Sequence, residues 1–277
     1  MTDAVGPGDG LPAGGATATV LGRYGSHPAP GGAGRGLLLS AGDGGAAAVL
    51  VGCGSGVAGR LGYALRSLGD LAAVVLPDLR PDHACDLWSV GSAAAAAARG
   101  GRRRGLLPVY AYGRPPAAWT ALHRPGVLDV RRFAAEDTVR AGGWTFRFAP
   151  LEHPWPTLAL RAEHPGGGAL GWVGPGRAGA EARALLAGVR LLLVDAGGPA
   201  EDDEGLDGGM APEDAGALAA AAGALRLLLC HLDPDDAPAE LLARARAAFP
   251  SSALALEGRT YEVGDPSWAA PGPAASG

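Results

Sequence analysis

Short apolar runs bounded by glycine and proline alternate along the chain with segments of helical spacing. Such a run favours a buried strand, whereas apolar residues three and four positions apart favour an amphipathic helix. Strands are predicted at residues 17–22, 36–41, 47–52, 71–77, 105–115, 144–152, 157–163, 169–174, 190–196, 225–231, 253–257 and 259–263. Helices are predicted at residues 56–69, 86–99, 117–123, 178–188, 211–223 and 237–249.

The order of these elements predicts an α/β fold. Each half of the chain begins with strands and continues with strand–helix units, which is typical of two sheets packed face to face with helices outside, a four-layer αββα sandwich. A single doubly wound sheet is the alternative, but the opening strands have connections as short as those of hairpins. Residues 17–263 are expected to form one domain. Residues 1–16 and 264–277 are rich in Gly, Pro and Ala and are expected to be disordered tails.

Composition narrows the possible functions. The 277 residues are 48% hydrophobic, enough for a sizeable core, and the net charge of −5 argues against general nucleic-acid binding. The chain contains no Lys, Asn, Gln or Ile, so no lysine can serve as a base. Cys53, Cys85 and Cys230 form no C-x-x-C pair, which is typical of a reducing compartment. Without a signal peptide or a membrane-length apolar run, the protein is expected to be soluble and cytoplasmic, with no membrane partner.

Seven segments, in this order, resemble metallo-β-lactamase-fold metallohydrolases of the ribonuclease Z-like kind common in actinobacteria. They are TVLGRYGSHPAPGG (19–32), LVGCGSGVAG (50–59), DLRPDH (78–83), LEHPWPTLALRAEH (151–164), ALGWVGPGR (169–177), GMAPEDAGALAAAAG (209–223) and LLLCHLDPDDAPAELLARARAAF (227–249). The resemblance runs from Thr19 to Val263. It implies the four-layer sandwich and makes a homodimer a candidate assembly.

The resemblance implies a metal centre, but several ligand positions are changed. The family holds two divalent ions, usually zinc, on a His-x-His-x-Asp-His loop and on later His, Asp and His residues. Three kinds of position can be distinguished in this chain. Those that match a family ligand are Asp82, His83, His153 and His231. The two first histidines of the loop are replaced by Asp78 and Arg80, and the bridging aspartate by Pro175. The supporting Asp and His of the family fall on Gly52 and Gly209.

Arg80 is incompatible with an ion at the first position. A guanidinium has no lone pair to donate. A unit charge 4 Å from a dication costs about 8 kcal/mol at an effective dielectric near 20. We therefore expect the first-ion site to be lost. The Arg80 side chain is expected to occupy the place of the lost first ion. It would form a buried or half-buried ion pair with Asp78 or Asp82, with bidentate geometry to one carboxylate.

The second ion keeps Asp82, His83 and His231, which is a workable zinc set. If Asp82 is committed to Arg80, the two imidazoles are too few for tight binding. His153 is either a ligand or a strand cap. Cys230 and Cys85 are expected to be buried thiols with no catalytic role.

These observations favour a non-catalytic pseudo-hydrolase without a cofactor, acting by binding a small molecule or a protein. The alternative is a hydrolase of esters, lactones or phosphodiesters that uses one zinc ion on Asp82, His83 and His231.

Overall fold

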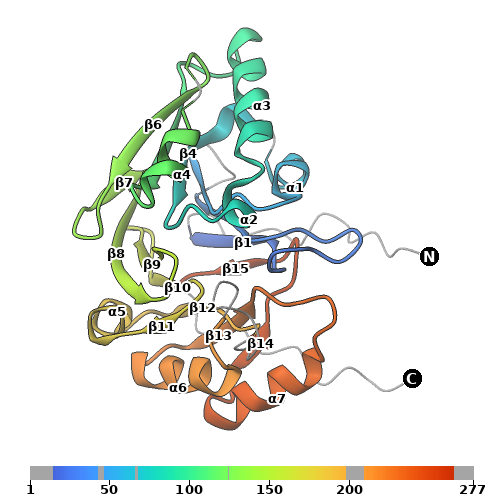
Figure 1. Ribbon diagram of the computed structural model, residues 1–277, viewed down its shortest axis with the longest axis vertical. Coiled ribbons are helices and arrows are strands. Elements are labelled where there is room, and N and C mark those ends of the chain that lie inside the picture. The colour runs from blue at the N-terminus through green and yellow to red at the C-terminus, as the bar shows by residue number, and fades with distance from the viewer. Residues whose placement is uncertain (1–14, 43–46, 66–67, 124, 198–208, 265–277) are drawn as a thin grey trace.

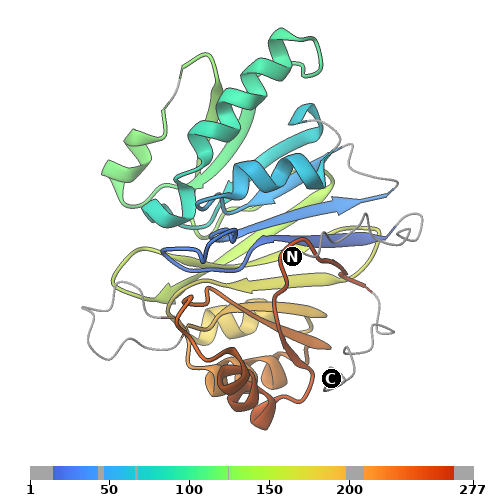
Figure 2. The ribbon, with the colours of Figure 1, turned by 90° about the vertical axis from the view of Figure 1, so that its right-hand side faces the viewer.

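The computed structural model describes residues 15–42, 47–65, 68–123, 125–197 and 209–264 (Figures 1 and 2). Within these residues the chain forms two sheets that lie face to face, each covered on its outer side by helices. The predicted four-layer αββα sandwich is therefore confirmed. In the same residues no helix is both long and apolar enough to cross a membrane.

The first sheet has the strand order β15-β1-β2-β3-β4-β5-β6. Its strands are β1 (Ala16–Gly22), β2 (Gly36–Ala41), β3 (Ala48–Val51), β4 (Leu71–Leu76), β5 (Leu107–Tyr112), β6 (Leu128–Phe133) and β15 (Thr260–Glu262). Strands β1, β2 and β3 pair antiparallel, as their short connections predict, whereas β3 to β6 pair parallel.

The second sheet has the order β11-β8-β9-β10-β12-β13-β14, with β7 paired to β8. Its strands are β7 (Val139–Ala141), β8 (Trp144–Glu152), β9 (Leu158–Glu163), β10 (Ala169–Val173), β11 (Arg177–Ala178), β12 (Leu191–Asp195), β13 (Arg226–Cys230) and β14 (Ser252–Leu254). Strands β10, β12, β13 and β14 are parallel, because a helix follows β10, β12 and β13 and returns the chain to the same edge.

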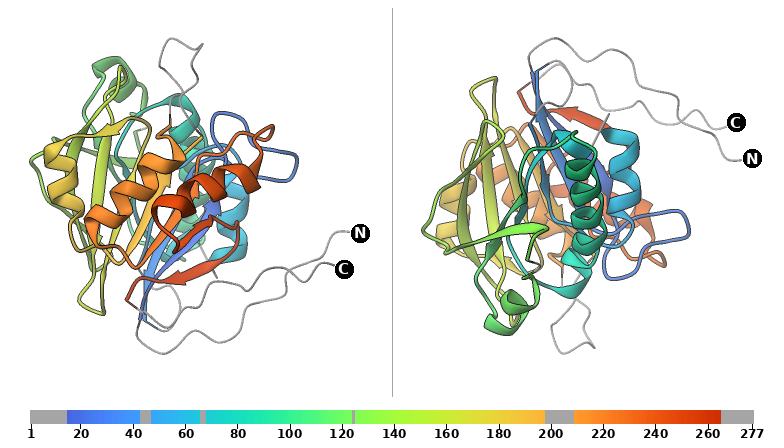
Figure 3. Two further views of the ribbon diagram at one scale, coloured as in Figure 1. Left: turned by 90° about the horizontal axis from the view of Figure 1, so that it is seen from below. Right: turned by 90° about the horizontal axis from the view of Figure 1, so that it is seen from above.

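The helices of each half lie on the outer face of their own sheet, as Figure 3 shows in views from below and from above. Those over the first sheet are α1 (Val57–Ala64), the 3₁₀ turn η1 (Leu68–Asp70), α2 (Pro81–Ala84), α3 (Leu87–Arg99) and α4 (Pro116–Ala121). Those over the second sheet are α5 (Ala180–Leu186), α6 (Pro212–Ala222) and α7 (Pro238–Ala248).

Three apolar layers hold the four structural layers together. The central layer joins the two sheets and contains side chains such as Val51 and Val75 from one sheet and Leu160 and Leu193 from the other. The outer layers join α1 and α3 to the first sheet and α5 and α6 to the second. Burial on both faces explains why the strands at 71–77 and 190–196 are continuous apolar runs.

The carboxyl ends of the parallel strands place polar residues at one edge of the sandwich. The loop 78–83 follows β4, Pro175 follows β10, Asp195 ends β12, and His231 follows β13. Loops at the carboxyl ends of parallel strands are the usual place for ligands in α/β proteins. This edge is therefore where the candidate site lies.

Several elements differ from their predictions. The first helix ends at Ala64 instead of residue 69, and the strands β6, β7 and β11, the short helix α2 and the turn η1 were not predicted. Strand β6 (LDVRRF) buries only its two end residues, so its apolar pattern is weak. Strand β1 begins at Ala16, the last residue of the expected N-terminal tail. Residues 1–14, 265–277 and most of the acidic segment 201–209 lie outside the described residues.

Candidate functional site

The loop between β4 and α2 carries the first group of site residues. Pro81 begins α2, and this turn brings Asp82 and His83 to the same side of the loop. The backbone N–H of Arg80 donates to Oδ1 of Asp78 at 3.1 Å, and the N–H of His83 donates to the carbonyl of Arg80 at 3.0 Å. A short aspartate side chain that closes on the backbone two residues later is a common way to fix a tight turn.

His83 lies between two carboxylates. Its Nδ1 is 2.8 Å from Oδ1 of Asp78, and its Nε2 is 3.1 Å from Oδ2 of Asp82. Burial by itself would lower the pKa of His83, but the two carboxylates raise it above its ordinary value. Burial would likewise raise the pKa of Asp78, yet His83 and Arg35 hold it well below its usual range. The geometry thus favours an imidazolium between two carboxylates.

Arg80 is buried and points toward the site. Its Nε lies 3.2 Å from Oδ1 of Asp82, and the side chain is 6% exposed. The expected ion pair with Asp82 is present, whereas the contact with Asp78 runs through the backbone of Arg80. Burial would raise the pKa of Asp82, but His83 and Arg80 hold it below its usual range.

A second arginine, Arg35, lies at the centre of the site and was not anticipated. Its NH1 is 3.0 Å from Oδ2 of Asp78, 3.3 Å from Oδ2 of Asp195, and 3.2 Å from Nδ1 of His83. The side chain is 3% exposed, and its guanidinium carbon lies 4.1 Å from the centre of the Trp172 ring. Nε and NH2 have no hydrogen-bond partner among the described residues. The internal cation expected from Arg80 is therefore supplied mainly by Arg35.

Asp195 is the third carboxylate of the site. Its Oδ1 accepts a hydrogen bond from Nε1 of Trp172 at 3.0 Å, and Sγ of Cys230 lies 3.2 Å from the same oxygen. Burial would raise the pKa of Asp195, but Arg35 and the neighbouring imidazoles keep it below the ordinary value. For Cys230, burial and Asp195 raise the thiol pKa well above its ordinary value, so it is a protonated core thiol.

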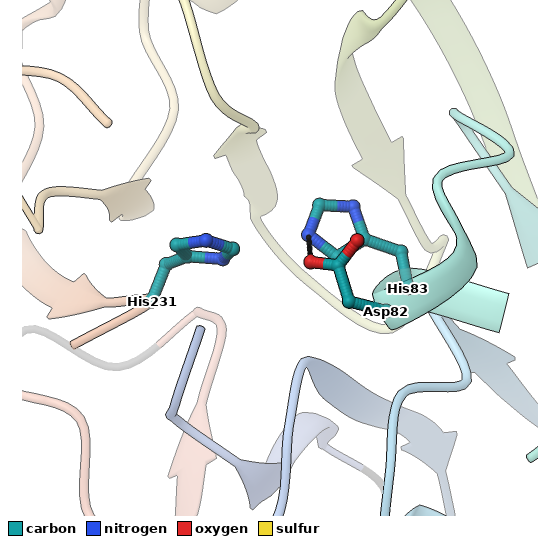
Figure 4. A group of neighbouring side chains, drawn as sticks. All are labelled: Asp82, His83 and His231. Atoms are coloured by element: carbon teal, nitrogen blue, oxygen red, sulfur yellow. Dashed lines mark ion pairs between the residues drawn. The ribbon is translucent and has the colours of Figure 1, made fainter. Parts of the chain in front are cut away.

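His231 lies across the site from Asp82 and His83 (Figure 4). Its ring meets that of His83 edge-on, with centroids 5.2 Å apart, and its Nδ1 is 3.6 Å from Oδ2 of Asp195. Burial lowers the pKa of His231 to about 4, against the opposing effect of Asp195, so the ring is neutral at pH 7. The backbone of His231 has φ +60°, a conformation that costs a non-glycine residue about 1–2 kcal/mol.

The other sequence-predicted positions are not part of the group formed by Asp82, His83 and His231. His153 is half-buried, and its Nδ1 accepts a hydrogen bond from the Trp155 backbone at 2.9 Å. Pro175 is buried beyond β10 and offers no donor atom. A Cβ at Gly209 would stand 2.8 Å from the backbone N of Gly197. Backbone atoms of Gly197 and Asp195 therefore stand where a side chain at position 209 would begin. Cys85 is exposed, so the expectation of a buried thiol is wrong: it lies at the outer end of the short α2 turn.

A two-ion centre does not fit these residues. Both oxygens of Asp78 are already engaged, Oδ1 by Arg80 and His83 and Oδ2 by Arg35. Arg80 has no lone pair, and Pro175 replaces the bridging carboxylate. The guanidinium groups of Arg35 and Arg80 stay charged at any relevant pH, so two dications in this site would be repelled by two fixed positive charges.

The residues present match a single zinc ion in the type and number of ligands. Asp82, His83 and His231 each offer one ligand atom, and these atoms lie within 4.8 Å of one another. Nδ1 of His231 is buried without a hydrogen bond among the described residues, whereas Nε2 of His83 and Oδ2 of Asp82 face each other at 3.1 Å. Ligands at about 2.1 Å from a tetrahedral zinc ion lie about 3.4 Å apart, so the set would have to contract, and His83 would have to lose a proton.

Arg35 and Asp195 were missed by sequence reasoning. Asp195 had a usable signal, because it is a lone acidic residue at the end of the apolar run RLLLVD, as Asp78 is after VVLP. Arg35 lies in the glycine-rich segment GGAGRG (31–36), and its sequence surroundings carry no comparable signal.

An open hollow of about 930 Å³ lies elsewhere, between the start of α3 and the end of α4. It is lined by Trp88, Ser89, Ser92, Ala93, Ala121 and His123. None of the site residues described above contributes to it.

Comparison with known proteins shows the family of this chain. A family model described as "Beta-lactamase superfamily domain" matches residues 48–232. The probable metallo-hydrolase YhfI of Bacillus subtilis (strain 168) is 28% identical over 236 residues, which are 83% of this chain and 93% of that protein. The crystal structure of YhfI, a metallo-β-lactamase-fold protein, has a TM-score of 0.79 at 26% identity and covers 90% of this chain and 99% of that one.

The human short-form tRNase Z has a TM-score of 0.66 at 16% identity, covering 89% of this chain and 99% of that one, and shows the fold alone. The family match begins at β3 and ends just after His231, so it includes every ligand position from the loop 78–83 onward but not Arg35. The chain therefore belongs to the β-lactamase superfamily and has the metallo-β-lactamase fold.

Proposed function

We propose that this protein does not carry out two-metal hydrolysis and instead acts by binding a ligand or a partner protein. One observation carries the proposal: each carboxylate of the site already faces a fixed positive side chain. Asp78 and Asp195 face Arg35, Asp82 faces Arg80, and His83 lies between Asp78 and Asp82.

This arrangement opposes an ion in two ways. Three carboxylates face two guanidinium groups and one imidazole that its neighbours favour in the charged form, so the group is close to neutral without any metal. A dication would add charge beside arginines that cannot release a proton. Displacing Arg35 would break a buried ion pair, which costs about 3–5 kcal/mol when one partner is lost.

The hollow between α3 and α4 supports the proposal that the protein binds a ligand or a partner protein. Trp88, on its rim, is 42% exposed, and Ala93 and Ala121 provide apolar walls. Tryptophan is enriched among the residues that dominate binding energy at interfaces.

A hydrolase with one zinc ion is the second candidate, and the Asp82–His83–His231 group favours it. These three residues would hold the ion, with Asp78 orienting His83 through Nδ1. A zinc ion bound there would supply Lewis-acid polarisation of a substrate oxygen. The substrate class in that case is an ester, a lactone or a phosphodiester.

Metal analysis of protein purified without chelator tests the proposal. We expect below about a tenth of an equivalent of zinc, because three contracted ligands must compete with the ion pairs. Hydrolysis of a chromogenic phosphodiester is expected to stay at the background rate when zinc is added.

His231→Ala and His123→Ala form a matched pair of variants, since His123 is exposed and remote from the three ligands. About one equivalent of zinc in the wild type and in His123→Ala, lost with hydrolysis in His231→Ala, would replace the proposal with the second candidate.

A further inference from the structure

Two carboxylate oxygens from separate elements converge on one nitrogen of Arg35. Asp78 Oδ2 comes from the loop after β4 and Asp195 Oδ2 from the end of β12, and they lie 3.0 and 3.3 Å from NH1. Two buried carboxylates facing a single point are the surroundings of a cation.

We propose that NH1 of Arg35 occupies a cation site and that this arginine ties together the loops at the carboxyl ends of β4 and β12, as a bound metal ion would. The proposal concerns the folded chain itself. It holds whether or not Asp82 and His231 bind an ion, because neither residue contributes a ligand atom to this point.

Neighbouring residues are suited to a planar cation rather than to a spherical one. The ring of Trp172 lies 4.1 Å from the guanidinium carbon, a cation–π contact that a hydrated metal ion would not make in this way. Trp172 also donates to Asp195, so it holds both partners of the ion pair.

Two glycines leave the space that the arginine fills. A Cβ at Gly174 would stand 3.0 Å from NH1, so a side chain there would displace the guanidinium. A Cβ at Gly52 would stand 3.6 Å from Cγ of Arg35 and 3.6 Å from the Trp172 ring. Position 52 is where the family has a supporting aspartate, and the stem of Arg35 now runs beside it.

Removing the arginine side chain should expose the cation site to solution ions. Zinc holds oxygen ligands at about 2.0–2.2 Å, so the two carboxylate oxygens would have to move inward by about 1 Å. Asp78 lies on a loop and Asp195 is the last residue of β12, so neither is fixed in the middle of an element. Arg35→Ser should therefore create zinc dependence that the wild type lacks.

Thermal unfolding in EDTA and in excess Zn²⁺ tests this. In EDTA, Arg35→Ser is expected to lower Tm by about 10 °C, because buried carboxylates lose their partner. Zinc is expected to restore more than half of that loss. Arg35→Met, which fills the space without a charge, should lose a similar amount and regain none with zinc.

Arg103→Ser is the matched control, since Arg103 binds the carbonyl oxygens of Leu71 and Leu106 and faces no carboxylate of the site. Its Tm should not respond to zinc. If Arg35→Ser does not fold in EDTA, its soluble yield on refolding is measured with and without zinc instead. Zinc should raise the yield of Arg35→Ser but not that of Arg35→Lys, which keeps a positive charge at the site.

Two double variants separate this site from the Asp82–His83–His231 group. Zinc rescue should persist in Arg35→Ser/His231→Ala and disappear in Arg35→Ser/Asp195→Asn. An unchanged Tm in Arg35→Ser, no rescue by zinc, or rescue that requires His231 would overturn the inference. A zinc-dependent Tm of the wild type that vanishes in His231→Ala would instead overturn the proposed function.

Discussion

The indole ring of Trp172 lies against the guanidinium group of Arg35, and the same ring donates from Nε1 to Asp195. One side chain of β10 thus contacts both members of a buried ion pair. The contact links the second sheet to the residue that precedes β2 of the first sheet, so the two halves of the sandwich meet at this point through charge as well as through apolar packing.

Trp172→Phe should destabilise the protein by about 2 kcal/mol, because it removes the hydrogen bond to a buried carboxylate. Trp172→Leu also loses the cation–π face and should cost about 4 kcal/mol. Urea unfolding followed by circular dichroism measures both. Trp144→Phe is the control, since Trp144 is equally buried but its Nε1 has no hydrogen-bond partner among the described residues. A loss in Trp144→Phe as large as that in Trp172→Phe would contradict the role of the hydrogen bond.

Stability should fall in acid. Asp78 and Asp195 have folded-state pKa values below the ordinary one, so the unfolded chain binds more protons as the pH drops through about 4. Their contribution is present above that pH and is lost below it. The urea midpoint should begin to decrease below about pH 6.5, where the unfolded chain protonates His231, and should decrease further below about pH 4 as the two aspartates are protonated in the unfolded chain. Asp78→Asn should make the decrease shallower, and an identical slope in that variant would count against this assignment.

Gly209→His, which restores the family residue, should not restore a ligand. Its Cβ would stand 2.8 Å from the backbone N of Gly197 and 2.9 Å from the carbonyl oxygen of Asp195. Because backbone must shift, we expect a loss of about 2–4 kcal/mol. Gly62→His is the control, since a Cβ at that exposed helical position meets nothing within 4 Å. Equal stabilities for the two variants in urea unfolding would contradict the close approach of backbone to position 209.

Restoring the replaced ligands should fail while Arg35 is present. The triple variant Asp78→His, Arg80→His, Pro175→Asp is expected to stay below about a tenth of an equivalent of zinc, because a fixed unit charge near a dication costs about 8 kcal/mol. Adding Arg35→Ser should raise the zinc content several-fold. Metal analysis of both proteins decides the matter, and tight binding by the triple variant alone would show that Arg35 does not exclude the ion.

The fold could be predicted because burial on both faces leaves a strong pattern. Strands such as β4 and β12 are uninterrupted apolar runs, and α1 buries Val57 and Leu61, which are four positions apart. Edge elements could not be predicted in the same way. Strand β6 carries Asp129, Arg131 and Arg132 in a six-residue segment, so its membership of the sheet depends on pairing with β5 and not on its own pattern.

The candidate site was predictable only in part, for a related reason. The resemblance supplied the positions of Asp82, His83 and His231, and the structure brings these three together. It could not supply Arg35, because that residue is distant in sequence from every ligand position and no family ligand stands there. A charge that compensates others through space leaves no local trace in the sequence.

Strand β15 has a consequence for how the chain is made. Residues 260–262 pair with residues 17–19 of β1 and so close the edge of the first sheet (Figure 1). This pairing joins segments separated by about 241 residues of chain. The edge of the first sheet at β1 therefore stays unpaired during synthesis until β15 has been translated, and contacts of such long separation are slow to form.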